Sequence, residues 1–255
     1  MQVPLGANVT SDPTLLFESK EQIAKRRHLE KLANDPVYRR RGTPTRLGGK
    51  VLDIDLVSIS PTNGPLFVVG LANHVAKVFY PAAKQHEDQD KPSDNGQVIA
   101  VLKGHNGPVT CVAAVPTELS GQDNQWVLTG SWDKTVRLWS VKGSRLLAVY
   151  MGHGDFVKSL VVDPLRRQFY TGSADAEIRA WPIPAPGSLP HDGDSCSAPM
   201  QLSATWVLKK HRRSVDSLVI SNDHDWIFSA GSDRKIYAWK FGSEEAGAKP
   251  AMDGE

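Results

Sequence analysis

The sequence predicts an all-β protein built from a repeated unit. A phrase that ends in an aromatic side chain is written four times, at residues 67–79, 127–139, 169–181 and 227–239. Short runs of β-branched and aromatic residues surround each copy and are punctuated by Gly, Asp and Asn, as expected for β-strands joined by turns. The period of about forty residues indicates stacked repeats, because one such unit cannot bury its own apolar face.

The third copy shows how each unit is expected to fold. Residues 156–162 and 168–173 predict two strands, and residues 177–181 predict a third one after a tight turn. An outer strand is expected before the next copy, at residues 204–209. Four antiparallel strands per unit is the pattern of a propeller blade.

The chain divides into three regions. We expect blades at about residues 46–102, 103–150, 151–209 and 210–240. A partly disordered N-terminal extension (1–45) with a short helix precedes them, and a disordered tail (241–255) follows. Polar insertions rich in Pro and Gly, at residues 81–96 and 182–202, predict surface loops. The fourth unit shows no outer strand after Trp239.

The N-terminal extension carries the basic charge of the chain. Residues 20–50 have a net charge of +7, whereas the whole chain has +2. Ser19 and Gln22 make the pattern of a capping box, which predicts a helix that starts there. Such a segment suits nuclear import or contact with an acidic surface such as RNA, and a solvated tail explains it equally well. The arginines concerned are Arg26, Arg27, Arg39, Arg40 and Arg41.

Composition narrows the class of protein further. The chain has two cysteines and no apolar run near the roughly 18 residues that a membrane span needs. It opens without the basic start and apolar stretch of a secretory signal. A reducing compartment, nuclear or cytoplasmic, is therefore expected. No cofactor and no metal are expected, because the loop stretch 86–88 lacks the regular spacing of metal ligands.

These residues resemble the WD40 repeat family. Gly104-His105 and Gly152-His153 match its Gly-His dipeptide, and Lys210-His211 is a degraded form. An aspartate follows each histidine after 28, 22 and 22 residues, and a tryptophan follows each aspartate after six. The first unit departs from the pattern, since it has Asn73 and Phe79 in place of Asp and Trp and no preceding histidine.

The resemblance implies a structural role for the recurring polar residues. In this family a buried His, a Ser or Thr, the turn Asp and the Trp form a hydrogen-bonded set that links strands. The implied residues are His105, Ser131, Asp133 and Trp139; His153, Ser173, Asp175 and Trp181; and His211, Ser232, Asp233 and Trp239. Thr129 or Thr171 could supply the hydroxyl in their blades. Three equivalent copies argue against Ser-His-Asp catalysis, which needs one exposed nucleophile.

The number of units is lower than the resemblance implies. Propellers of this family usually close with seven blades, and four can be read here. An open set of blades would expose strand edges and apolar faces, which promotes association. Either a partner or a second copy completes the ring, or the chain is a shortened version of a longer protein.

The function that the sequence favours is a non-enzymatic scaffold for protein–protein interactions in a multisubunit complex. A fold this widely reused does not itself name a partner. Loop positions near the blade entries are the expected contact residues: Asn106, Trp132, Asp155, Lys210, Arg212 and Arg213. The alternative is an RNA-associated component of a nuclear ribonucleoprotein that uses the basic N-terminal segment.

Overall fold

The computed structural model describes residues 45–60, 64–81, 97–121, 125–189, 198–241 and 251–252. Residues from Thr45 onward belong to one compact unit. The predicted N-terminal extension, including its helix and the arginines Arg26, Arg27, Arg39, Arg40 and Arg41, lies outside the described residues apart from Thr45 itself. Most of the two polar insertions also lies outside them.

Four antiparallel sheets make up the described part of the chain, and we call them blades 1 to 4. Blade 1 contains β1 (Val51–Ser60), β2 (Gly64–Leu71), β3 (Val75–Tyr80) and β4 (Gln97–Lys103). Blade 2 contains β5 (Val109–Val115), β6 (Trp126–Ser131), β7 (Val136–Ser140) and β8 (Arg145–Tyr150). Blade 3 contains β9 (Val157–Asp163), β10 (Gln168–Ser173), β11 (Glu177–Pro182) and β13 (Trp206–Lys209). Blade 4 contains β14 (Val215–Ile220), β15 (Trp226–Gly231), β16 (Ile236–Lys240) and β17 (Ala251–Met252).

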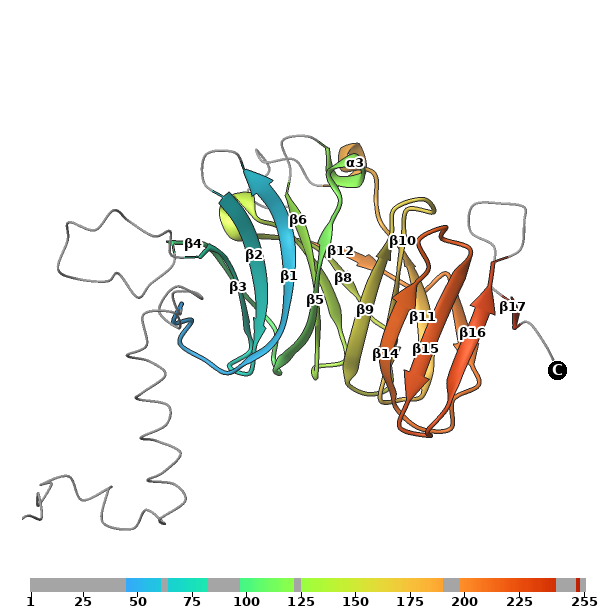
Figure 1. Ribbon diagram of the computed structural model, residues 1–255. Coiled ribbons are helices and arrows are strands. Elements are labelled where there is room, and N and C mark those ends of the chain that lie inside the picture. The colour runs from blue at the N-terminus through green and yellow to red at the C-terminus, as the bar shows by residue number, and fades with distance from the viewer. Residues whose placement is uncertain are drawn as a thin grey trace, which may run out of the picture. The chain divides into compact units, whose positions relative to one another are not determined.

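The blades follow one another in chain order, and their first strands lie side by side. Strand β1 contacts β5, β5 contacts β9, and β9 contacts β14 (Figure 1). Asp53 and Asp55 of β1 accept hydrogen bonds from the amides of Val112 and Ala114 of β5, each at 2.8 Å. These bonds satisfy backbone donors on the edge of the neighbouring blade. The prediction of an all-β protein with propeller-like blades is confirmed.

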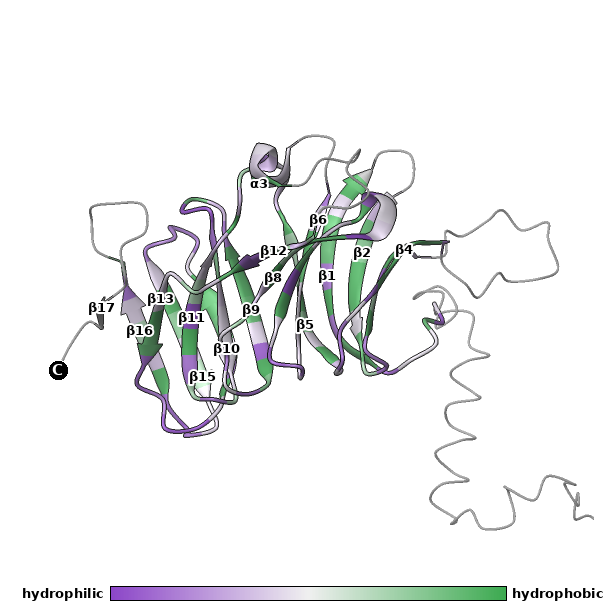
Figure 2. Cartoon of the chain, turned by 180° about the vertical axis from the view of Figure 1, so that it is seen from behind, coloured by the Kyte–Doolittle hydropathy of each residue, from purple (hydrophilic) through white to green (hydrophobic). Residues whose placement is uncertain are grey.

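The hydrophobic core lies between the blades. Each blade has a front face, packed on the next blade, and a back face, packed on the preceding one. At the junction of blades 2 and 3, Leu128 and Leu138 of the front face pack against Phe169 and Trp181 of the back face. The tryptophans that end the second, third and fourth repeats are therefore core residues of the junctions. Figure 2 shows the hydrophobic residues in the strands and the hydrophilic ones in the turns at the lower ends of the blades.

The stack ends on an exposed apolar face at blade 4, whereas the back face of blade 1 is exposed only in part, because its Val69, Leu71 and Phe79 are 0%, 0% and 4% exposed. On the front face of blade 4, Phe228 is 40% and Ile236 75% exposed, whereas the equivalent Tyr170 and Ile178 of blade 3 are 0% and 1% exposed. Val219, on the same face and paired with Phe228, is also exposed. Val51, Ile54 and Leu56 are exposed side chains of β1 in blade 1. The structure thus has one front face and one back face without a neighbouring blade among the described residues.

The structure differs from the sequence-based expectation in three short segments. In the expected loop 182–202, β12 (Met200–Leu202) pairs in parallel with β8. In the stretch before β6, α3 (Thr117–Ser120) buries Leu119. Two 3-10 turns complete the elements, η2 (Lys142–Ser144) and η3 (Pro186–Ser188).

The tail after residue 240 also differs from the expectation of disorder. Its residues Ala251 and Met252 form β17, which pairs with Lys240 and Trp239 of β16. Blade 4 therefore has the outer strand that the sequence did not indicate. The physical reason is that the outer edge of β16 offers unpaired backbone groups, and a following extended segment satisfies them.

Candidate functional site

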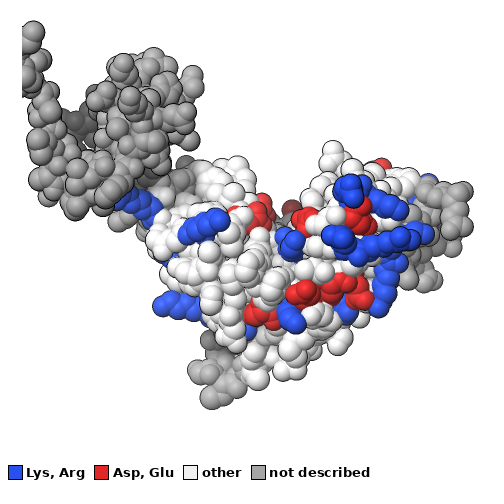
Figure 3. All heavy atoms as spheres, turned by 90° about the horizontal axis from the view of Figure 1, so that it is seen from below, with Lys and Arg blue, Asp and Glu red and all other residues white. Residues whose placement is uncertain are grey.

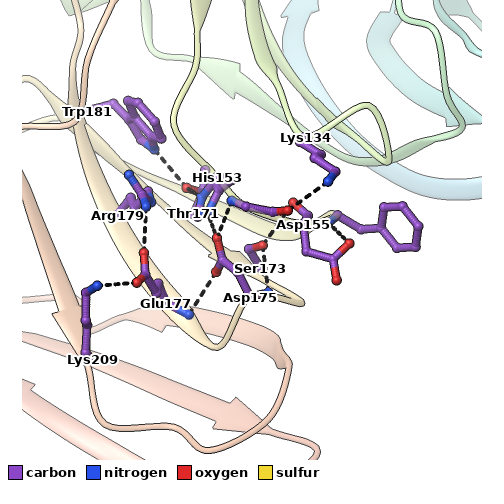
Figure 4. A network of polar contacts seen from close by, with 12 residues as sticks. Lys134, His153, Asp155, Thr171, Ser173, Asp175, Glu177, Arg179, Trp181 and Lys209 are labelled. Carbon is purple, nitrogen blue, oxygen red and sulfur yellow. Dashed lines mark hydrogen bonds and ion pairs between the residues drawn. The ribbon is translucent and has the colours of Figure 1, made fainter.

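Blade 3 contains a buried chain of four polar side chains. The indole Nε1 of Trp181 donates to Thr171 Oγ1 at 2.8 Å, and that oxygen lies 2.7 Å from Nε2 of His153. The Nδ1 of His153 lies 2.9 Å from Oδ2 of Asp175 (Figure 4). An indole only donates and a carboxylate only accepts, so every atom is satisfied when the threonine donates to Nε2 and Nδ1 donates to Asp175.

Blades 2 and 4 repeat this chain with the same geometry. In blade 2, Nε1 of Trp139 and Nε2 of His105 each lie 2.8 Å from Thr129 Oγ1, and Nδ1 of His105 lies 2.7 Å from Asp133. In blade 4 the corresponding residues are Trp239, Ser229, His211 and Asp233, at 2.9, 2.9 and 3.0 Å. We call each set a tetrad.

The hydroxyl members differ from the expected Ser131, Ser173 and Ser232. Ser131 and Ser173 instead accept the amide hydrogens of Asp133 and Asp175, each at 3.1 Å, and donate to carbonyls of the entry loops. Ser232 donates to Asp216. Ser131 and Ser173 thus shape the turns, and none of the three serines hydrogen-bonds the histidine or tryptophan ring of its blade.

Strand register explains which hydroxyl meets the tryptophan. Trp181 pairs directly with Phe169, and side chains alternate between the two faces of a strand. Thr171, two residues further along β10, therefore lies on the same face and diagonally opposite the indole. In blade 4, Ile227 pairs with Trp239, which places Ser229 in the same position.

The aspartates hold two loops together. Asp175 accepts the amide hydrogens of Gly154, in the loop that enters blade 3, and of Glu177, in the turn between β10 and β11. Burial alone would raise the pKa of Asp175, but the hydrogen bonds from His153 and from these two amides outweigh it and lower the pKa to about 2. The same causes, acting through His105 and Thr135, lower the pKa of Asp133.

The tetrads do not form a catalytic centre. Thr129 and Thr171 have no exposed surface, and Ser229 has almost none, so none of the three hydroxyls can meet a substrate. A nucleophile must be reachable from the solvent and lie near donors for the developing charge. The tetrads are therefore structural, and each one fixes the entry loop of its blade to a turn of the same blade.

The loops that these tetrads support form one surface, which we call the entry surface. It consists of the entry loops 104–108, 152–156 and 210–214 and the turns 132–135, 174–177 and 232–235. The predicted contact residues Asn106, Trp132, Asp155, Lys210, Arg212 and Arg213 all lie on it.

A stacked aromatic pair bridges blades 2 and 3 on the entry surface. Trp132, in a turn of blade 2, lies over Phe156, in the entry loop of blade 3, with ring centroids 4.8 Å apart and planes at 15°. The two side chains remain 44% and 36% exposed. Next to them, Lys134 Nζ donates to the Gly154 carbonyl at 2.8 Å and so joins the same two blades. The sequence indicated Trp132 and missed Phe156.

The part of the chain that the structure describes offers neither a metal-binding cluster nor a membrane-spanning helix. It contains no group of three or more His, Cys, Asp and Glu side chains placed to hold a metal ion. Nor does any helix there have the length and apolar content to cross a membrane. The stretch 86–88 lies outside the described residues.

Blades stacked face to face, with a Trp–hydroxyl–His–Asp chain repeated in blades 2, 3 and 4, define a β-propeller repeat protein. Residues 96–140, 144–182 and 202–240 match the WD40 family, described as WD domain, G-beta repeat. The chain is a WD40 repeat protein. The first matched repeat begins at β4, the outer strand of blade 1, and leaves out β1 to β3, in agreement with the absence of a tetrad histidine ahead of blade 1.

Several known proteins and solved structures are similar to this chain over part of their own length. An uncharacterized WD repeat-containing protein of Schizosaccharomyces pombe is 25% identical over 232 residues, which cover 90% of this chain and 54% of that protein. A pre-mRNA-splicing factor of Candida albicans is 29% identical over 38% of this chain and 24% of its own. A chain of the Chaetomium thermophilum Polycomb Repressive Complex 2 bound to GSK126 aligns with a TM-score of 0.62 at 18% identity, over 82% of this chain and 43% of that one. The chain spans about half the length of the first of these relatives.

Proposed function

We propose that this chain is a non-enzymatic scaffold that docks a partner protein on its entry surface, as part of a multisubunit complex. The observation that carries the proposal is the exposed stack of Trp132 on Phe156. Aromatic side chains supply most of the energy at protein interfaces when they are held in place before binding. WD40 repeats generally mediate protein interactions, and the names of the relatives include a splicing factor.

The stack is held in place from both sides. Trp132 stands in a turn that two hydrogen bonds fix: the Asp133 amide donates to the Ser131 hydroxyl, and the Thr135 amide donates to the Asp133 carboxylate. Phe156 follows Asp155, whose carbonyl accepts from Ser173 and whose carboxylate accepts the Phe156 amide at 2.8 Å. Because these two loops are already ordered, they lose little conformational entropy on binding, which favours affinity.

Substituting both Trp132 and Phe156 by alanine is expected to abolish partner capture. Loss of an interface anchor costs about 2 kcal/mol or more, which corresponds to about 30-fold weaker binding. The measurement is affinity purification with quantitative mass spectrometry, comparing the wild type with the double variant. The matched control is Leu165→Ala, because Leu165 is an exposed apolar residue in the turn after β9. Equal recovery of partners by the wild type and the double variant would disprove the proposal.

A second copy of the chain is the proposed partner for the exposed end faces. Each junction in the structure packs a front face on a back face, and at the two ends of the stack these faces have no neighbouring blade among the described residues. The front face of blade 4 is exposed, and at blade 1 the exposed part of the back face is the β1 side, with Ile54 and Leu56. Two copies related by a two-fold axis can place the front face of blade 4 of each copy on the back face of blade 1 of the other. No blade face is then left without a neighbour, and the assembly stops at two copies. The resulting ring would have eight blades, within the range of about four to eight seen in propellers.

The 255-residue chain is therefore expected to dimerise in solution. Light scattering behind a sizing column should show a dimer for the wild type and a monomer for Ile236→Lys, because a charge at the centre of an apolar contact stays unpaired. Leu165→Lys, which adds the same charge away from both end faces, should leave the dimer intact. A wild-type monomer at all concentrations would disprove the dimer.

The RNA-associated alternative depends on the basic N-terminal segment, which lies outside the described residues. Its support is indirect and consists of the net charge of residues 20–50 and a relative named as a splicing factor. A nuclear or cytoplasmic location agrees with either function. The RNA role stays a prediction.

A further inference from the structure

Blade 4 carries a hollow on the entry surface. Its volume is about 310 Å³, and its lining residues are Arg212, Arg213, Ser232, Asp233, Arg234 and Lys235. They come from the loop that enters β14 and from the turn between β15 and β16. Figure 3 shows Lys and Arg side chains gathered at the blade 4 end of this face.

The charge of this hollow is specific to blade 4. The four positions that Arg212, Arg213, Arg234 and Lys235 occupy are filled in blade 3 by Gly154, Asp155, Ala176 and Glu177. In blade 2 they are filled by Asn106, Gly107, Lys134 and Thr135. Because blade 3 folds the same loops around the same tetrad with two anions and no cation, the fold does not require positive charge at these positions.

The four cations of the hollow have no acidic partner in the described part of the chain. Other cations of blades 3 and 4 are paired: Arg179 with Glu177 at 2.6 Å, Lys158 with Asp216 at 2.7 Å and Lys209 with Glu177 at 2.5 Å. No such ion pair links the side chains of Arg212, Arg213, Arg234 or Lys235 to a described residue. Four unpaired cations around one hollow repel each other, and a bound anion would relieve that repulsion.

Asp233 does not neutralise the hollow, although it lies in its wall. Its carboxylate faces His211 at 3.0 Å and accepts the amide hydrogens of Arg212 and Lys235, each at 3.1 Å. Its side chain is only 7% exposed. These bonds direct its oxygens toward the tetrad, so the solvent-facing charge of the hollow is cationic.

We propose that this hollow binds a phosphoserine or phosphothreonine side chain of a partner protein. A phosphoryl group carries about −1.5 to −2 charges and several acceptor oxygens, which match clustered guanidinium donors. The volume lies at the lower end of the roughly 300–1,000 Å³ of small-ligand pockets, which suits one modified side chain. The inference rests on the proposed scaffold function and names the chemistry of a segment that it would dock.

The test is fluorescence anisotropy on the full chain with two labelled peptide pools. One pool has a central phosphothreonine between randomised flanks, and the other has an unmodified threonine. We expect the phosphorylated pool to bind at least tenfold more tightly.

The double variant Arg213→Asp with Lys235→Glu is expected to bind the phosphorylated pool at least tenfold more weakly than the wild type. Both new residues occupy these positions in blade 3, where they fit the same loops. The control, Lys103→Glu with Lys142→Glu, changes the net charge equally at exposed positions outside the hollow and should bind like the wild type.

Three results would overturn the proposal. Equal affinity for the two pools would show that the hollow does not recognise phosphate. Equal affinity of the two double variants would place the binding elsewhere or reduce it to net charge. Tighter binding of a labelled oligouridine than of the phosphorylated pool would assign the hollow to RNA. A failure here with Trp132-dependent partner capture intact would refute only the phosphate site and would leave the scaffold function standing.

Discussion

Thr171→Val is expected to lower the free energy of unfolding by about 2–4 kcal/mol, because it leaves two buried polar groups without a partner. The substitution keeps the branched shape of the side chain and removes only its hydroxyl. Nε2 of His153 and Nε1 of Trp181 then lose their shared partner, which lies 2.7 and 2.8 Å from them. Urea denaturation followed by tryptophan fluorescence and circular dichroism measures the change.

Ser173→Ala is the matched control for this prediction. Its hydroxyl belongs to the turn, where it bonds the Asp155 carbonyl and the Asp175 amide, and it contacts neither ring of the tetrad. Its removal should cost about 1 kcal/mol, the net contribution of an ordinary hydrogen bond. If Ser173→Ala proved as damaging as Thr171→Val, the hydrogen-bond chain described for blade 3 would be wrong.

The contrast between these two residues shows how far the sequence could predict the site. Repetition marked His153, Asp175 and Trp181, because their spacing recurs in each unit. The hydroxyl could not be read from spacing, since Thr171 and Ser173 both lie near the turn. Only the cross-strand register, with Trp181 opposite Phe169, shows which one lies under the indole.

The elements that the sequence missed depend on contacts distant in the chain. Strand β12 exists because it meets the outer edge of β8, and β17 because it meets β16. Neither segment has the alternating pattern of a strand, so no local signal predicts it. Strand β10, by contrast, has the bounds expected from its hydrophobic run.

The sequence indicated only some of the residues that form the basic hollow. Lys210, Arg212 and Arg213 form a basic run that suggested a binding surface. Arg234 and Lys235 lie more than twenty residues later and gave no signal of their own. The tetrad brings the two segments together, because Asp233 binds the amides of both Arg212 and Lys235.

Acid is expected to unfold the protein through the tetrad aspartates. The pKa of Asp175 is about 2 in the folded protein against an ordinary value of 3.8, so the unfolded chain takes up its proton first as the pH falls. The stabilisation by Asp175 is therefore complete above its unfolded pKa and is lost as the pH falls from about 4 to about 2. One shift of this size corresponds to about 2 kcal/mol. Asp133 and Asp233, with pKa values lowered in the same direction, add to the loss.

Urea denaturation at pH 7, 4, 3 and 2 measures this dependence, and Asp175→Asn separates the contribution of blade 3. An asparagine cannot ionise, so this variant should be less stable than the wild type at pH 7, and the difference should shrink below pH 4. The residues that surround Asp175 make this a test of the tetrad, because its carboxylate contacts the His153 ring and the amides of Gly154 and Glu177. A wild-type stability that stays constant between pH 4 and pH 2 would contradict a carboxylate held ionised by these three donors. So would a stability difference between wild type and variant that is the same at pH 7 and at pH 2.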